Sequence, residues 1–219
     1  MPNTQAKVPK ATKIIPKAVI LIDVEVRYHA ELMNALVAYA NSGCMVIYLK
    51  GLFNVRLVDV KPFSGRFNLP WDIAAYLRSG YVVNPACRHA FQIVSLAPRY
   101  NIKACLLKDV DEADKLYVLE PGARYQSLPL QGTGQLGHEL TGETYTPAAL
   151  GAVGEGYIAY FGDVNSENET FIAVVALGCK MHPGLQSAQE PISVSITGAP
   201  RMTTLRVSPN GTSDYRIFY

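Results

Sequence analysis

The residues of this chain best suited to chemistry are carboxylates, amides and one lysine that stand just beyond apolar segments. Asp23 comes directly after the run AVILI, Lys50 after the run MVIYL, and Asp163 after the run GYIAYFG. A lysine beside carboxylates can act as an acid–base group with a shifted pKa, or it can form an ion pair that stabilises the rim of a fold. Asp23, Lys50 and Asp163 are therefore the catalytic candidates.

The segments around these residues predict a βαβ unit. Residues 18–22 and 45–49 are short apolar runs typical of buried strands. Between them, residues 28–41 carry apolar side chains at helical spacing, and Ser42 and Gly43 supply the signal that ends a helix. Two strands joined by a helix indicate a crossover connection and a parallel sheet.

A later segment repeats this arrangement. Residues 154–162 predict another strand, and residues 170–181 predict the helix after it. Ser166 and Glu169 have the spacing of a capping box, so the helix is expected to begin at Ser166. Because parallel strands end at one sheet edge, the polar residues that follow them should converge there. The expected ligand-binding residues at this edge are Glu25, Asn54, Asn165 and Ser166.

Trp71 is the single tryptophan of the chain and stands close to Phe63 and Phe67 in the sequence. Aromatic side chains can line the mouth of a pocket for an apolar ligand, or they can pack a loop onto the core. Trp71 is therefore included among the ligand-binding candidates, with the packing role left open.

The middle of the chain gives weaker signals. Pro70 and Gly80 bracket a predicted helix over residues 70–79, and Asn84 with Pro85 predicts a further helix that ends near Leu96. Residues 103–110 predict a strand, whereas residues 50–69 and 120–152 indicate loops. From Pro191 onward, alternating apolar residues predict two or three antiparallel strands.

Length and composition place the chain among ordinary globular proteins. It has 219 residues, 49% of them hydrophobic and 17% charged, with a formal net charge of +2. We expect a tail over residues 1–17, one α/β domain over 18–182 and a β-hairpin extension over 183–219 packed on that domain. The small net charge disfavours a nucleic-acid partner, and no apolar run is long enough to predict a membrane span. The start lacks the apolar core of a signal peptide, so a cytoplasmic location is expected.

Cysteine and histidine do not form ligand patterns. The four cysteines stand singly in apolar surroundings, which is typical of buried reduced thiols. The four histidines have no metal-ligand spacing, and on the predicted helix Cys87 and His89 would point to different faces. We expect neither a metal site nor a cofactor.

Three segments resemble a protein family: HAELMNALVAYANSGCMVIYLKGLF, FNLPWDIAAYLRSGYVVNP and GEGYIAYFGDVNSENETFIAVVALGC. They are similar to a fungal group of class I glutamine-amidotransferase-like proteins, related to trehalose-utilisation (ThuA) and biotin-protein-ligase N-terminal-like domains. The resemblance covers about residues 18–181. It implies a flavodoxin-like, three-layer αβα fold with a mostly parallel sheet, to which the β-rich C-terminal extension would be added.

The chain departs from this family at its catalytic positions. The resemblance implies a nucleophilic cysteine after the strand at 45–49, where this chain has Lys50 and Gly51. It implies a catalytic histidine after the later strand, where this chain has Asp163, Val164 and Asn165. Cys–His glutaminase chemistry is therefore not expected. The family also implies a further strand and helix before residue 18. Their lack would leave a sheet edge to be covered by the C-terminal strands or by a second subunit in a homodimer.

Three functions remain open from the sequence. The first is a non-glutaminase domain that binds a small polar or anionic ligand in a degenerate cleft, in fungal metabolism. The second is an acid–base enzyme of secondary metabolism, an isomerase, cyclase or lyase, that uses Asp23 or Asp163 with Lys50. The third is a structural or assembly protein, which the β-rich tail would serve.

Overall fold

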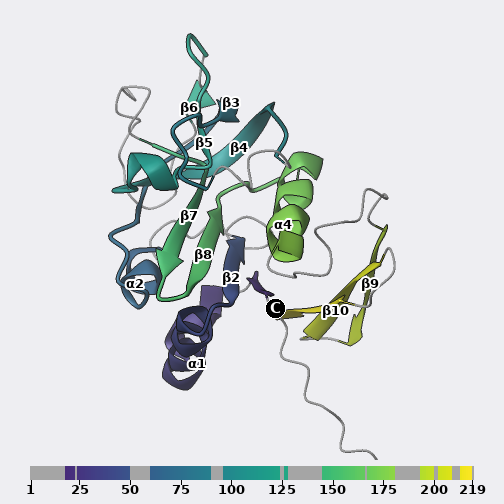
Figure 1. The fold of residues 1–219 in the computed structure, drawn as a ribbon. Coiled ribbons are helices and arrows are strands. Elements are labelled where there is room, and N and C mark those ends of the chain that lie inside the picture. Colours follow the sequence, from purple (N-terminus) through teal and green to yellow (C-terminus); the bar gives the residue numbers. More distant parts are fainter. Residues whose placement is uncertain are drawn as a thin grey trace, which may run out of the picture.

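The computed structural model describes residues 18–22, 24–49, 60–89, 96–123, 126–127, 145–165, 167–180, 193–199, 202–208 and 213–218. They form a mixed α/β structure with two sheets (Figure 1). Sheet A has the strand order β7-β8-β2-β1-β11-β10-β9. Sheet B has the order β4-β3-β5, and β6 also pairs with β3.

The centre of sheet A is parallel, and both of its flanks are antiparallel. The parallel strands are β8 (Gly156–Phe161), β2 (Met45–Leu49), β1 (Ala18–Leu21) and β11 (Ser213–Phe218). β7 (Ala148–Val153) pairs antiparallel with β8 at one flank. The predicted βαβ unit is confirmed, because β1 and β2 are parallel and α1 (Ala30–Asn41) joins them. Gly43 ends this connection with a φ of +91°, a conformation that glycine adopts without strain.

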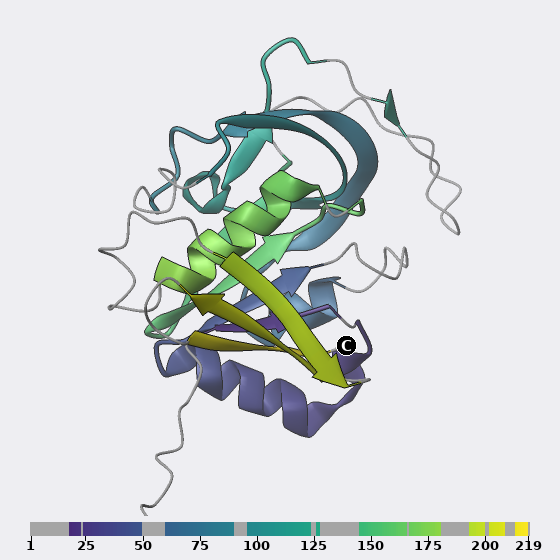
Figure 2. The ribbon, with the colours of Figure 1, turned by 90° about the vertical axis from the view of Figure 1, so that its right-hand side faces the viewer.

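The two faces of sheet A are covered by different elements. On one face, α1 and α2 (Val60–Gly65) pack against alternate strand residues, including Val46 and Tyr48. On the other face, α4 (Asn168–Lys180) packs against the intervening residues, including Ile47 and Phe161. Figure 2 shows α1 and α4 on opposite sides of the strands. This alternation is the period-two pattern of a sheet buried on both faces, and it explains why all five residues of β2 are buried.

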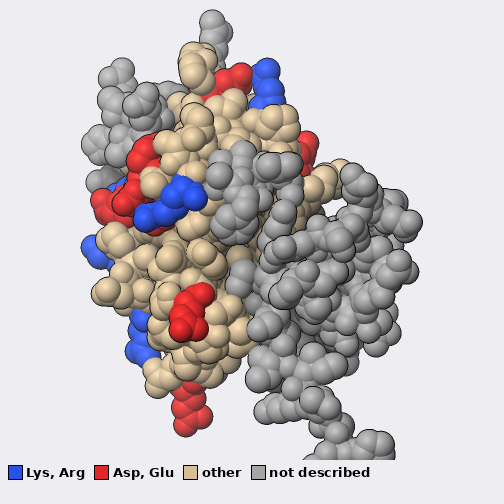
Figure 3. Space-filling model, in the orientation of Figure 1, with Lys and Arg blue, Asp and Glu red and all other residues tan. Residues whose placement is uncertain are grey.

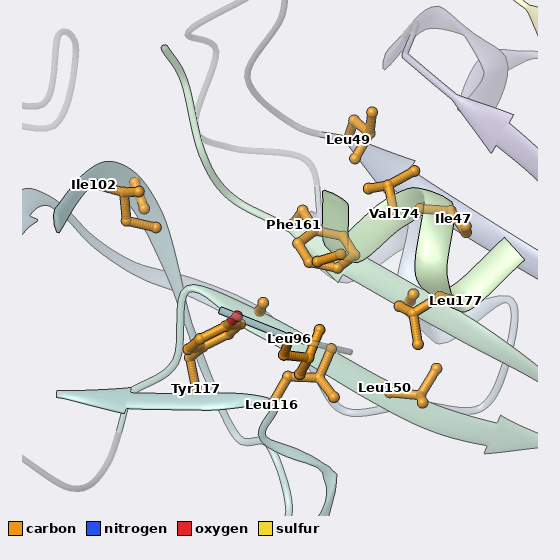
Figure 4. Close-up of a cluster of buried hydrophobic side chains, with 14 of the residues drawn as sticks. Ile47, Leu49, Leu96, Ile102, Leu116, Tyr117, Leu150, Phe161, Val174 and Leu177 are labelled. Carbon is orange, nitrogen blue, oxygen red and sulfur yellow. The ribbon is translucent and has the colours of Figure 1, made fainter. Parts of the chain in front are cut away.

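Sheet B covers the same face as α4. Its main strands are β3 (Asp72–Val83) and β4 (Arg99–Lys108), with β5 (Tyr117–Leu119) and β6 (Gln126–Ser127) beside them. β3 and β4 are curved and arch above the upper end of α4 (Figure 2). Figure 4 shows the joint core, in which Ile102 of β4 and Phe161 of β8 belong to one apolar cluster with Val174 and Leu177 of α4.

Three predictions in the middle of the chain are wrong. Residues 72–79 belong to β3 and not to a helix, because β3 pairs with β4 over most of its length. Residues 84–89 form turns in place of the start of a helix, because the Asn84 side chain accepts a hydrogen bond from the Ala86 backbone N–H at 3.0 Å and thereby closes a turn. Residues 148–152, predicted as loop, belong to β7, whose pairing with β8 supplies their hydrogen bonds.

Other predictions agree with the structure more closely. The strand predicted at 103–110 corresponds to β4, and the helix predicted at 170–181 corresponds to α4. The helix begins at Asn168 and not at Ser166, which lies outside the described residues. α2 was predicted as loop; its Pro62 is tolerated because it lies in the first turn of the helix.

The C-terminal segment forms three antiparallel strands, as predicted: β9 (Ser193–Ala199), β10 (Met202–Ser208) and β11. β11 pairs in parallel with β1 in the register Ile20–Ile217, so the segment extends sheet A. This pairing occupies the edge of β1 that faces away from β2.

Candidate functional site

The carboxyl ends of the central parallel strands meet at one edge of sheet A. The registers pair Leu21 of β1 with Phe218 of β11, and Leu49 of β2 with Phe161 of β8. The strand ends are therefore level with one another, and the residues that follow them start from the same edge. The polar residues that follow the apolar runs in the sequence are expected at this edge.

β2 and β8 are neighbours, but the helices that follow them lie on opposite faces of the sheet. Tyr48 of β2 contacts Phe63 of α2, with ring centroids 4.7 Å apart. Phe161 of β8 packs on the other face with Val174 of α4. Adjacent parallel strands whose connections leave on opposite faces open a crevice beyond their carboxyl ends, which is the usual ligand position in open α/β sheets. We take the carboxyl ends of β2 and β8 as the candidate site.

On the β8 side of the site, the chain is held tightly against sheet B. The backbone carbonyl of Gly162 accepts a hydrogen bond from the Cys105 N–H at 2.8 Å, and the Val164 N–H donates to the carbonyl of Lys103 at 3.0 Å. A Cβ atom at Gly162 would lie 2.0 Å from the Cys105 carbonyl oxygen. Only glycine permits this approach, so Gly162 fixes where the next residue, Asp163, begins.

Asp163 is buried, and both of its carboxylate oxygens are occupied by backbone amides. Oδ1 accepts a hydrogen bond from the Asn165 N–H at 2.9 Å, and Oδ2 accepts one from the Glu167 N–H at 2.7 Å. The Glu167 carbonyl in turn accepts from the Phe171 N–H at 3.3 Å in the first turn of α4. Asp163 therefore satisfies donors that lie just ahead of the helix, which is a structural role.

The neighbouring polar residues form a short exposed network. Asn165 is exposed, and its Nδ2 donates to Glu167 Oε1 at 3.4 Å. Arg78 of β3 lies with its Nη2 3.8 Å from the same oxygen. Of the other sequence candidates, Glu25 belongs to the 3-10 helix η1 (Val24–Tyr28). Asp23, Lys50, Asn54 and Ser166 lie outside the described residues, as does the side chain of Glu25.

Trp71 lies in the core, away from the strand ends. Only 2% of its surface is exposed, and its ring packs against Gly151 in the middle of β7. The Trp71 carbonyl accepts a hydrogen bond from Ser64 Oγ of α2 at 2.7 Å. The structure therefore gives Trp71 a packing role between α2 and sheet A.

Three tyrosines and one threonine near the start of α4 were not identified from the sequence. Tyr81, Tyr100 and Tyr117 come from β3, β4 and β5, and Thr170 belongs to the first turn of α4. All four side chains are buried. Leu77, Ser79 and Tyr81 are buried at every second position, which is typical of a strand. The helix predicted over residues 70–79 concealed this pattern.

A second polar cluster lies at the turn 84–89 and the 3-10 helix η2 (Glu112–Asp114). Buried Asn84 donates to the carbonyls of Glu112 and Lys115 at 2.7 and 3.0 Å. Asp114 Oδ1 accepts from Arg88 Nε at 2.7 Å and lies 3.4 Å from His89 Nε2. These bonds join two loops, so the cluster has a structural role.

The described cysteines are buried thiols without a disulfide: Cys44, Cys87 and Cys105. Burial is the largest cause that raises the pKa of Cys87, which makes its thiolate scarce at neutral pH. Within the described ranges, no group of three or more His, Cys, Asp or Glu side chains is arranged to hold a metal ion. The helices that the structure describes include none both long and apolar enough to cross a membrane.

Charged residues do not gather by sign on the face shown in Figure 3, where acidic and basic side chains lie intermixed among uncharged ones.

No protein-family model and no curated protein matches the chain. Solved structures do match at low similarity. They include a beta-galactosidase from Rahnella sp. R3 (11% identity, TM-score 0.44) and a GH42 beta-galactosidase from G. stearothermophilus (13%, TM-score 0.43). A third is a beta-galactosidase from Bacillus circulans sp. alkalophilus (14%, TM-score 0.39). The matches cover 87–88% of this chain and 26–27% of those proteins, so the chain spans about a quarter of their length.

Proposed function

We propose that this chain is a ligand-binding domain of the flavodoxin-like, glutamine-amidotransferase-like type, with a site at the carboxyl ends of β2 and β8 and without glutaminase activity. The occupied carboxylate of Asp163 is the observation that carries this proposal. Both oxygens of the buried Asp163 accept backbone hydrogen bonds from the turn ahead of α4, so this side chain has a structural task at the position where the resemblance implies a catalytic histidine. Asp163 thus stabilises the turn just ahead of α4.

The positions of the cysteines agree with this proposal. Cys44 directly precedes β2, at the end of the strand opposite the site. Cys105 is fully buried within β4. The residues that follow β2 in the sequence are Lys50 and Gly51, which supply no thiol. A nucleophilic cysteine at the end of β2, on which glutamine hydrolysis would depend, is therefore lacking.

The charges around the site favour a neutral polar ligand over an anion. Asp163, Glu167 and Glu169 all lie near the start of α4. One amide just ahead of the helix, the Glu167 N–H, already donates to Asp163. The helix dipole is thus complemented by the chain's own carboxylates, and a further negative charge there would be repelled.

Two measurements test the proposal. Incubation with glutamine should release ammonia only at the background rate of a protein-free control. Incubation with a metabolite extract, followed by native mass spectrometry, should show one small neutral molecule bound per chain. Glutamine hydrolysis that is abolished by Cys44→Ser or Cys105→Ser would overturn the proposal.

A further inference from the structure

The C-terminal extension moves the open edge of sheet A from β1 to β9. β11 pairs with β1, and β10 and β9 follow it, so β9 is the last strand of the sheet on this flank (Figure 2). One side of β9 pairs with β10 over its whole length. No strand among the described residues pairs with its other side. The backbone N–H and C=O groups on that side form a row that can bind a further strand.

Two other outer strands have their free sides covered. At the opposite flank of sheet A, the Leu116 N–H donates to the carbonyl of Ala148 in β7 at 2.9 Å. On the outer side of β4, the Leu107 N–H donates to the Thr146 carbonyl at 2.9 Å, and the Thr146 N–H donates back to the Leu107 carbonyl at 3.1 Å. β9 differs from both of these strands.

The sequence of β9 has none of the features that protect an edge strand. Natural edges commonly carry a lysine, a proline or a β-bulge. β9 reads SVSITGA, without a charged residue or a proline, and its register with β10 is continuous over all seven residues. The charged residues of the extension strands stand inside the sheet instead, at Arg206 in β10 and at Asp214 and Arg216 in β11. This distribution is the opposite of a protected edge, so we expect β9 to pair with a further strand.

A second copy of β9 suits this edge. Antiparallel pairing of two identical strands presents the same edge on both chains and closes the pair by two-fold symmetry, the commonest symmetry of soluble oligomers. With the axis at Ile196, the middle residue of β9, all seven residues of each copy are paired. A strand with a lysine or a glutamate would bring like charges together in such a pair, whereas SVSITGA brings none.

We propose that this chain forms a homodimer in which the β9 strands of two copies pair antiparallel about Ile196. The pairing joins two copies of sheet A into one continuous sheet. β1, β11 and β10 separate β9 from β2 in the strand order, so this interface is distinct from the candidate site at β2 and β8.

Disulfide cross-linking tests the proposed register. Ile196→Cys places the two added cysteines opposite each other, with Cα atoms about 4.5–5.5 Å apart, within reach of a disulfide. Leu205→Cys is the matched control, because Leu205 pairs with Ile196 within one chain but would lie about 14 Å from its own copy, three strand spacings away. We expect mild oxidation to convert Ile196→Cys into a covalent dimer. Leu205→Cys and the parent chain should remain single chains on a denaturing, non-reducing gel.

Light scattering tests the dimer without a cross-link. The full chain at micromolar concentration should have twice the mass of one chain. Thr197→Lys should weaken the dimer at least tenfold at low salt, and less at high salt, because it brings two like charges to neighbouring positions of the paired strands. A mixture of Thr197→Lys and Thr197→Asp should form dimers again. Their formation shows that both variants are folded.

Three results would overturn the proposal. The first is a parent chain that is monomeric at micromolar concentration, above all one whose β9 amides exchange as slowly as those of β10, since another segment of the same chain would then cover the edge. The second is equal cross-linking of Ile196→Cys and Leu205→Cys. The third is a dimer that Thr197→Lys leaves intact, because such a dimer would use another surface.

Discussion

The Oδ2 atom of Asp163 accepts a hydrogen bond from the backbone N–H of Glu167 at 2.7 Å, across the turn between β8 and α4. This contact joins the end of a central strand to the start of the helix that covers it. It gives the acidic residue at the carboxyl edge of the sheet a structural role.

Replacement of Asp163 by alanine should destabilise the protein, because two backbone N–H groups lose their acceptor. We expect a loss of about 1–2 kcal/mol in the free energy of unfolding, measured by urea denaturation. Asp163→Asn retains one acceptor oxygen and should lose less. An Asp163→Ala protein as stable as the parent would show that the two hydrogen bonds contribute nothing to stability.

Gly162→Ala should lower the stability of the protein, because the new Cβ atom would lie 2.0 Å from the Cys105 carbonyl oxygen. The strand must then move away from β4, at a cost of about 3 kcal/mol. Gly65→Ala is the matched control, since no atom lies within 4 Å of its Cβ position. Equal melting temperatures for the two variants would contradict the close approach of β8 to sheet B.

The fluorescence of Trp71 should report the core. It is the single tryptophan of the chain and is 2% exposed, so its emission should be blue-shifted and poorly quenched by iodide. Unfolding should shift the emission to the red and restore quenching. Addition of a ligand of the candidate site should leave the spectrum unchanged, because Trp71 packs on Gly151 in the middle of β7. Strong iodide quenching of the native protein would place Trp71 at the surface.

The buried tyrosines make stability depend on alkaline pH. Burial is the leading cause that raises the pKa values of Tyr81, Tyr100, Tyr117 and Tyr160 in the folded protein. The unfolded chain loses these protons first, so the contribution of these tyrosines to stability is constant below a pH of about 10 and falls as the pH rises above it. Absorbance at 295 nm should show these tyrosines ionising together with unfolding, monitored by circular dichroism. Their ionisation in a protein that remains folded would contradict their burial.

The sequence could predict the elements with strong local patterns. AVIL and MVIYL are buried strands, and the helical spacing of residues 28–41 led correctly to α1. Residues 72–79 were predicted as helix because Pro70 and Gly80 resemble the limits of a helix, whereas the pairing with β4 that decides the structure is not visible locally. Gly80 lies within that strand beside Glu120.

The sequence could predict the position of the candidate site, at the carboxyl ends of the parallel strands, but not the roles of its side chains. Polar residues after apolar runs led to the carboxyl edge, and Asp163 does lie there. Its hydrogen bonds to Asn165 and Glu167 depend on the turn geometry, so a structural role could not be distinguished from a catalytic one. Tyr81 of β3 and Val174 of α4 lie far apart in the chain, and only the packing of sheet B and α4 brings them into one apolar cluster.

We propose that a small neutral molecule binds at the carboxyl ends of β2 and β8. The most direct measurement is native mass spectrometry of the protein after incubation with a metabolite extract, compared with Lys50→Met and Lys61→Met. Lys50 follows the end of β2 directly, whereas Lys61 is an exposed residue of α2. We predict one bound molecule that is retained by Lys61→Met and lost or weakened at least tenfold in Lys50→Met. Equal retention of that molecule by both variants, or no bound molecule in any of the three proteins, would contradict the account.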